Sequence, residues 1–184
     1  VKMIWHAASE LIDTAVDDKT HQQILEHIRS IPGVVAVHQL RTRTHGGHIF
    51  VDVHILVSPF ISVSEGHHIG ERVHLSLCEQ FHKIHDITVH IDPEDDEMTK
   101  PSVHLPDRKK IEAQLQDCWQ HLPCSSQIER IVLHYLQGQL QVEVYIAAHV
   151  TLNKQKTLLN RYRQAAATIA DIVEITLHFM PEKT

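Results

Sequence analysis

Apolar side chains in the first half of the chain follow two periodicities, one helical and one extended. Isoleucines three to four positions apart predict a helix over residues 20–31, which a Pro-Gly pair would end. Residues 34–43 and 48–57 are rich in β-branched side chains and flank a turn with two glycines, which is typical of an antiparallel hairpin. A second helix, capped by Ser64, carries an i, i+4 apolar stripe, and residues 87–91 alternate as a third strand. The predicted element order is αββαβ.

The same order returns after an acidic, proline-bearing connector. Helix, hairpin, helix and strand are predicted at residues 108–121, 128–150, 154–169 and 172–179. Val-Asp-Val-His-Ile at 51–55 matches Val-Glu-Val-Tyr-Ile at 142–146, which favours internal duplication over chance convergence of two apolar patterns. The sequence therefore predicts an α+β fold of two tandem αββαβ sandwiches, ferredoxin-like or metallochaperone-like.

Composition and charge exclude some classes of function and favour others. A net charge of −6 argues against a nucleic-acid partner, because phosphate binding relies on clustered Lys and Arg. The apolar runs fall short of the ~20 residues that a membrane helix needs. Cys78, Cys118 and Cys124 have no CxxC spacing and fit a reducing, cytosolic compartment. The anomaly is 18 histidines against 3 Tyr and 4 Phe, and it points to metal binding because imidazole is the commonest metal ligand.

Strand alternation gathers several of these histidines. Side chains on a strand point alternately to opposite faces, so residues between inward-facing apolar positions point outward. The outward set comprises His38, Asp52, His54, His90 and Asp92. Three imidazoles with carboxylate oxygen suit Zn²⁺ and also accept Co²⁺, Ni²⁺, Cd²⁺, Mn²⁺ or Fe²⁺.

Two further expectations depend on regular alternation. In the first strand, Val35 and Val37 would point inward. The outer face would then expose Leu40, Phe50 and Leu56, which predicts that this face is covered by dimerisation.

His67 lies two residues before Ile69 on the second predicted helix, so it is turned away from the buried stripe. Glu71 follows His67 at i+4 on the same helical face. A His-carboxylate pair at this spacing could close a metal site or orient a ligand.

Five segments also resemble a known family. Together they are similar to the soluble C-terminal domain of the cation diffusion facilitators, whose element order is αββαβ. The segments are Ile31-Pro32-Gly33-Val34, Val37-His38-Gln39-Leu40-Arg41-Thr42-Arg43, Phe50-Val51-Asp52-Val53-His54, Gly66-His67-His68-Ile69 and Val89-His90-Ile91-Asp92-Pro93.

The resemblance implies a domain plan. Residues 1–19 would lead down from the last membrane helix of a preceding membrane part, and a start at Val1 rather than Met fits such a fragment. Residues 20–97 would be the dimerisation and metal-binding domain, on the cytoplasmic side of the cell inner membrane. Residues 98–106 would be a linker and 107–184 a second domain.

The resemblance also implies a site and a mechanism. The family domain forms a homodimer and binds metal, partly at the subunit interface, at positions matching His38, His54, His67, His90 and Asp92. Gln39 departs from the family, which often has Asp there. Metal binding would favour a closed dimer and so regulate divalent cation efflux, zinc being the expected cation.

The second unit departs further from the family. Tyr145 and Met180 stand where the first unit has His54 and Asp92, so this unit should not bind metal in the same way. We expect it to have a structural or dimer-extending role.

Two rival functions stay open: a free-standing metal carrier or storage protein, and a tandem small-molecule regulatory module. The regulatory module predicts a strand opening each unit and a glycine-bearing loop before its first helix, and the sequence shows neither. An enzyme is not expected, because there is no HExxH and no nucleophile motif.

Overall fold

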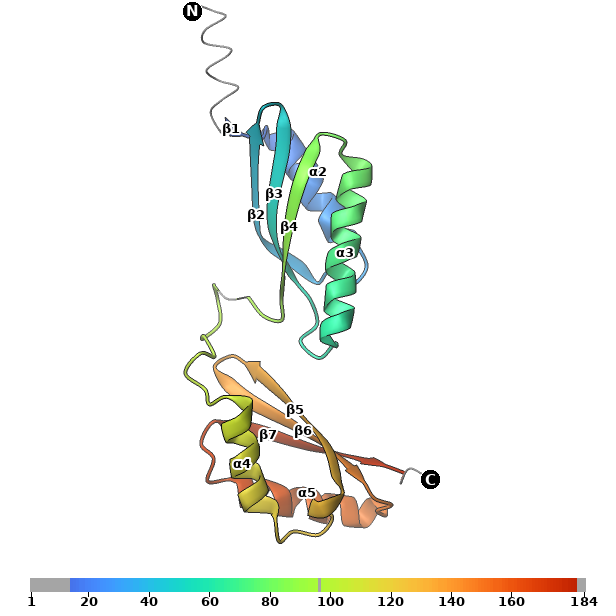
Figure 1. Ribbon diagram of the computed structural model, residues 1–184, viewed down its shortest axis with the longest axis vertical. Helices are drawn as coiled ribbons and strands as arrows, with labels where there is room; N and C mark the ends of the chain where they lie inside the picture. Colours follow the sequence, from blue (N-terminus) through green and yellow to red (C-terminus); the bar gives the residue numbers. More distant parts are fainter. Residues whose placement is uncertain (1–13, 96, 182–184) are drawn as a thin grey trace, which may run out of the picture. The chain divides into compact units, whose positions relative to one another are not determined.

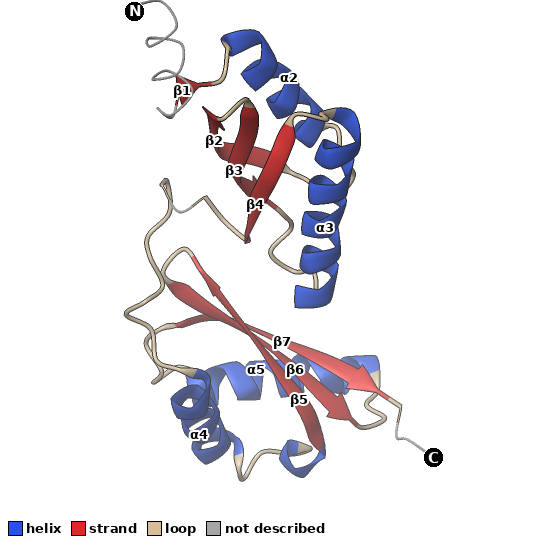
Figure 2. Ribbon diagram, turned by 45° about the horizontal axis from the view of Figure 1, so that its top comes forward, coloured by secondary structure: helices blue, strands red, loops and turns tan. Residues whose placement is uncertain are grey.

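The computed structural model describes residues 14–95 and 97–181. The chain forms two compact units, with the boundary between residues 97 and 98. Each unit is a sheet with two helices on one face (Figures 1 and 2). The predicted α+β class is confirmed, and both units contain the αββαβ order. In the first unit a two-residue strand, β1 (Thr14–Ala15), precedes that order, although the sequence pattern predicted no opening strand. The segment predicted to lead from a membrane helix lies, up to residue 13, outside the described residues.

In the first unit a mixed sheet runs in the order β1-β2-β3-β4. The pairs β1/β2 and β2/β3 are antiparallel, while β3/β4 is parallel because α3 crosses between them. The elements are β1 (Thr14–Ala15), α2 (Asp18–Arg29), β2 (Ala36–His45), β3 (His48–Leu56), α3 (Val63–Gln80) and β4 (Ile84–Asp92).

The cap of α3 differs from the prediction. Ser62, not Ser64, is the N-cap, and its side chain accepts a hydrogen bond from Glu65 N at 3.1 Å. The reason is backbone conformation. Ser62 is extended and can turn its hydroxyl onto the first turn, whereas Ser64 is already helical.

The second unit repeats the arrangement with a three-stranded sheet in the order β5-β6-β7. Again β5/β6 is an antiparallel hairpin and β6/β7 is parallel, with α5 as the crossover. The elements are α4 (Arg108–Trp119), the 3-10 helix η1 (Ser125–Gln127), β5 (Ile128–Leu136), β6 (Gln139–Ala147), α5 (Leu152–Ala166) and β7 (Ile172–Met180).

Each unit has its own core between sheet and helices. The first is aliphatic, with Ile24 and Ile28 of α2 and Val53 and Ile55 of β3 fully buried. Such side chains contribute about 1.5–3 kcal/mol each. The second core also holds two aromatic residues: Trp119 donates to the Tyr162 carbonyl at 3.1 Å, and the Tyr162 hydroxyl donates to the Pro123 carbonyl at 3.0 Å. Their polar groups are thereby satisfied inside the core.

A β-bulge interrupts β2 at His38. Val37 pairs with Ile55 and Gln39 pairs with His54, so His38 is the extra residue. His38 still points to the outer face, but inward orientation resumes at Leu40, which packs against the core. The predicted exposure of Leu40 is therefore wrong, and so is the inward position of Val35, which precedes β2 and is 64% exposed.

Candidate metal centre

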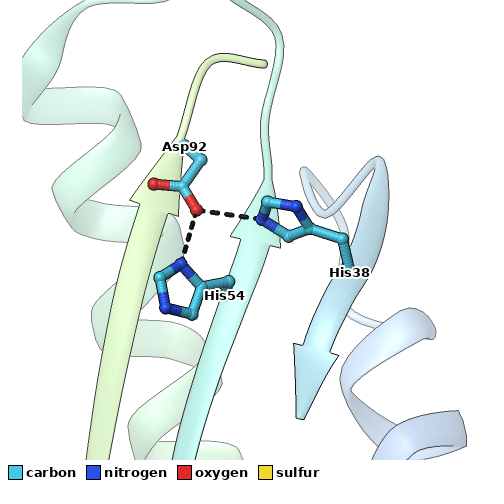
Figure 3. Close-up of side chains that lie close together, drawn as sticks. All are labelled: His38, His54 and Asp92. Atoms are coloured by element: carbon cyan, nitrogen blue, oxygen red, sulfur yellow. Dashed lines mark hydrogen bonds and ion pairs between the residues drawn. The ribbon is translucent and has the colours of Figure 1, made fainter. Parts of the chain in front are cut away.

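Three strands bring His38, His54 and Asp92 together on the outer face of the first sheet (Figure 3). His38 Nε2 lies 2.9 Å from Asp92 Oδ2, and His54 Nδ1 lies 2.8 Å from the same oxygen. One ligand atom from each residue lies within 4.8 Å of the others. We call this group the His38 cluster.

The His38 cluster is partly shielded from water. The side chains of His38 and Asp92 are 11% and 16% exposed. On its other nitrogen, His38 Nδ1 lies 3.1 Å from Asp95 Oδ1. Burial acts to lower the pKa of His38, but the hydrogen bonds with Asp95 and Asp92 outweigh it and raise the pKa above its usual range.

A second group, Asp52, His54 and His90, shares His54 with the first. His90 Nε2 lies 3.0 Å from Asp52 Oδ1, and the rings of His54 and His90 are stacked with centroids 4.2 Å apart. Asp52 Oδ1 is shielded from solvent and has no hydrogen bond to the rest of the described chain. We call this group the His90 cluster. It is more open, since His90 and Asp52 are 45% and 43% exposed.

Strand register places both clusters. In the parallel pair, His54 stands opposite His90 and Leu56 opposite Asp92. Buried Val53 and Ile55 anchor β3 on either side of His54. The ligands therefore lie on backbone that is fixed by hydrogen bonds and by burial of the opposite face.

Helix α3 packs closely against β4, the strand that carries Asp92. A Cβ at Gly70 would lie 2.9 Å from Ile91 Cδ1, so only glycine fits without displacement at this point of α3. Ile91 directly precedes Asp92. Packing at Gly70 thus holds the strand segment that carries the shared carboxylate.

His67 lies apart from both clusters. On α3 its Nε2 lies 3.5 Å from Glu71 Oε1, and both side chains are well exposed at 72% and 60%. The structure thus brings together His38, His54, His90 and Asp92 on one face of the sheet and leaves His67 on the helical layer. The predicted i+4 pairing with Glu71 is present.

Sequence reasoning left out two carboxylates. Alternation placed Asp52 on the outer face, but Asp52 was not counted as a ligand. The sequence did contain a sign of its role, because Asp52 lies two residues before His54 and therefore on the same face of the strand. Asp95 follows the end of β4, where no periodicity applies. Only the folded chain shows that Asp95 reaches His38.

The donor set fits a divalent cation of borderline softness. Two imidazole nitrogens and one carboxylate oxygen can occupy three positions around Zn²⁺ or a similar ion, leaving one open. An ion bound here would replace the direct His38-Asp92 and His54-Asp92 contacts with bonds to the metal. Bonds of about 2.0–2.1 Å to the ion need only small movements of these side chains.

The second unit lacks the His38 cluster. Its bulge falls at Glu129, between Ile128 and Arg130, as the first falls at His38. Tyr145 occupies the position of His54 and stacks on His178 with centroids 4.5 Å apart. Met180 pairs with Ala147, as Asp92 pairs with Leu56. All three His38-cluster positions have therefore changed.

Comparison with known proteins places the first unit in a family. Residues 16–94 match the family model for the cation efflux protein, cytoplasmic domain. No helix in the described residues has the length and apolar content to cross a membrane.

Several curated proteins are similar over longer or shorter stretches. Metal tolerance protein C1 of Arabidopsis thaliana is 30% identical over 161 residues, covering 82% of this chain and 34% of that protein. Cation-efflux pump FieF of Yersinia pestis (strain Pestoides F) is 33% identical over 93 residues, covering 50% and 31%. This chain thus spans about a third of the length of these relatives. The Arabidopsis match is too long to lie within the first unit, so the similarity extends into the second.

Solved structures are also similar to part of the chain. MamM-CTD 215-293 is 30% identical, with a TM-score of 0.41, and covers 42% of this chain and 100% of that one. The nickel form of a MamM CTD variant is 28% identical, with a TM-score of 0.42, and covers 43% and 100%.

Proposed function

Residues 16–94 belong to the cytoplasmic-domain family of cation efflux proteins, and on that premise we propose that this chain is the metal-responsive, dimer-forming region of a divalent cation efflux transporter. Zinc is the cation that we propose first. The membrane pathway would belong to a preceding part of the protein, with this region on the cytoplasmic side of the cell inner membrane. The role is binding and regulation, not catalysis.

The observation that carries the proposal is the shared carboxylate of the His38 cluster. Two imidazoles from two strands approach one oxygen of Asp92, at 2.9 and 2.8 Å. His38 and Asp92 are largely buried, so an ion held there would be shielded from competing water.

The proposed mechanism is a shift in the dimer equilibrium. Without metal, the carboxylates of Asp52, Asp92 and Asp95 on paired outer faces repel one another. A bound divalent cation neutralises that charge and favours the closed dimer. An ion can shift the equilibrium only by its difference in affinity for the two forms, so tight binding must go with closure.

His67 has a different place in this proposal. It lies on α3, outside both clusters, with a nitrogen 3.5 Å from Glu71. We propose that it completes a metal site of the partner subunit rather than its own. The His90 cluster, with two exposed members, is the group that an imidazole from another subunit could join.

The direct test is calorimetric titration of Zn²⁺ into the purified chain, with the dimer fraction followed by sedimentation. The wild-type chain should bind Zn²⁺ and shift towards a compact dimer. The double variant His54→Ala/Asp92→Ala should do neither, because it removes ligands from both clusters. The same titration with Co²⁺, Ni²⁺, Cd²⁺, Mn²⁺ and Fe²⁺ ranks these cations and Zn²⁺ by their affinity for the chain.

His68→Ala is the matched control. His68 is the exposed neighbour of His67 and belongs to neither cluster. Its removal should leave affinity and dimerisation unchanged. Equal binding by the wild type and the double variant would show that the outer face is not the site. Binding without a change in dimer fraction would favour a metal carrier over a regulatory region.

A further inference from the structure

A pocket of about 320 Å³ lies in the second unit beside the N-terminal half of α5. Its volume is within the range of small-molecule binding sites. Three segments of the chain form its walls. They are the turn after α4, which contains Cys124, the loop between β6 and α5, and one face of α5. We call it the Cys124 pocket.

Basic side chains surround the Cys124 pocket without an acidic partner. His149, Lys154 and Arg161 line it, and among the described residues no Asp or Glu joins them. Within that part of the chain, none of these three side chains forms an ion pair or a hydrogen bond. By contrast Arg163, on the same helix, donates to the carbonyl of Ile175 at 3.1 Å. Two fixed positive charges thus stay uncompensated at one pocket of a chain whose net charge is −6.

The interior of the Cys124 pocket is apolar. Leu158 is buried at the base of the pocket, and Val150 adds a second aliphatic wall. The three basic residues are exposed, so the charge lies at the rim. An apolar interior with a few polar groups is typical of sites for small organic molecules.

The first unit has the same turn, but the space beside it is filled. Residues 31–34 and 122–125 each form a turn in which the fourth N–H donates to the first carbonyl, at 3.1 and 3.3 Å. Both turns have Pro at the second position and a positive φ at the third, which is typical of a type II turn. In the first unit the third residue is Gly33, and a Cβ there would lie 2.7 Å from Ile69 Cδ1. The side chain of α3 therefore occupies this space in the first unit.

Cys124 stands at the position of Gly33 in the second unit. Its φ is 65°, a conformation that is unfavourable for a residue with a Cβ atom. Backbone strain of this kind is concentrated at binding and catalytic sites. The side chain of Cys124 forms part of the pocket wall. The second unit thus has a strained residue at the point where the two units differ.

We propose that the Cys124 pocket binds a small organic phosphate. Its dianionic head would lie among His149, Lys154 and Arg161, and its apolar body would pack on Leu158. A guanidinium group can bind two phosphate oxygens at once, while ammonium and imidazole each donate to one. A dianion matches the two fixed charges. The proposal does not depend on the metal site of the first unit.

The probe for the test is phenyl phosphate, titrated into the metal-free full chain so that phosphate cannot bind through a cation. Calorimetry should show saturable binding, at least about tenfold tighter than that of inorganic phosphate or benzyl alcohol, because each of these makes only half of the contacts. Lys154→Gln and Arg161→Gln should each lower the affinity about tenfold, and together about a hundredfold.

Lys156→Gln is the matched control. Lys156 is an exposed basic residue of α5 that does not line the pocket, and its substitution should leave the affinity unchanged. A second readout needs no substitution. Phenyl phosphate should slow the alkylation of Cys124 by iodoacetamide, followed by peptide mass spectrometry, and should leave that of the exposed Cys78 unchanged.

A free phosphate ester and the head group of an anionic lipid share this chemistry, and vesicles distinguish them. Cosedimentation with phosphatidylcholine vesicles that contain phosphatidic acid, lost in Lys154→Gln/Arg161→Gln, would identify a lipid head group. Binding of phenyl phosphate without cosedimentation would identify a soluble ester. Equal affinity of the wild type and the double variant for phenyl phosphate, or an equal loss with Lys156→Gln, would overturn the proposal.

Discussion

The outer faces of the two sheets share a scaffold but differ in their side chains. Both have an antiparallel hairpin followed by a parallel strand, and both have a bulge at the same point of the first hairpin strand. The first face holds His38, His54 and Asp92, and the second has Glu129, Tyr145 and Met180 in their places. The scaffold therefore persists without the ligands, and the His38 cluster depends on three side chains rather than on the fold.

The largest expected effect tests whether the two cores are stable independently of each other. Trp119→Ala should lower the free energy of unfolding of the second unit by about 3–5 kcal/mol, because it leaves a cavity beside Tyr162. Denaturant unfolding followed by circular dichroism measures the loss. Zn²⁺ binding by the His38 cluster should persist. The counterpart Leu77→Ala, in the first core, should impair that binding, and a reversed pattern would contradict independent units.

A transplant of ligands tests whether three positions suffice. Glu129→His, Tyr145→His and Met180→Asp together recreate the His38 cluster on the second scaffold. We expect one additional Zn²⁺ per chain in calorimetry, with affinity at least about a hundredfold above that of the variant lacking Met180→Asp. If no ion is gained, the scaffolds differ in more than their side chains.

Packing behind the first site gives a smaller effect. Gly70→Ala should destabilise the first unit by about 1–3 kcal/mol, although alanine favours helices, because its Cβ would lie 2.9 Å from Ile91 Cδ1. Zn²⁺ affinity should fall with it, since Ile91 adjoins Asp92. Gly66→Ala is the matched control: its Cβ meets Ile91 Cγ2 at an ordinary 3.5 Å. Equal effects of the two substitutions would contradict the close-packing argument.

The smallest effect concerns pH. Protonated imidazole cannot coordinate a metal, so Zn²⁺ binding at the His38 cluster should weaken as pH falls. Because Asp95 helps to raise the pKa of His38, the proton competes from a higher pH than for an ordinary histidine. Asp95→Asn should move this weakening to lower pH and reduce affinity at neutral pH by about tenfold at most. Calorimetry across a pH series measures both, and an unchanged pH profile would show that Asp95 does not act through His38.

Much of the fold followed from periodicity alone. The order of helices and strands depends on which side of each element is apolar, and the spacing of apolar residues within each short segment shows which side that is. The predicted inward set of β3, from Ile49 to Ile55, is buried as alternation requires. Helix ends were less predictable, since Ser62 and Ser64 both have a capping side chain and only backbone conformation distinguishes them.

Local pattern could not place the bulge at His38. An extra residue in a strand is decided by pairing with a neighbour that is distant in sequence, so Leu40 turned inward against the prediction. The outward direction of His38 still held, because the bulge begins at that residue.

By itself, the sequence determined two αββαβ units and one sheet face rich in histidine and aspartate, because alternation is a property of each strand. Only the tertiary structure decided which of those side chains meet. It set Asp92 between His38 and His54, brought Asp95 to His38 and left His67 on the helical layer. Those contacts depend on strand register, on a bulge and on the packing of α3 against β4, all of which join residues far apart along the chain.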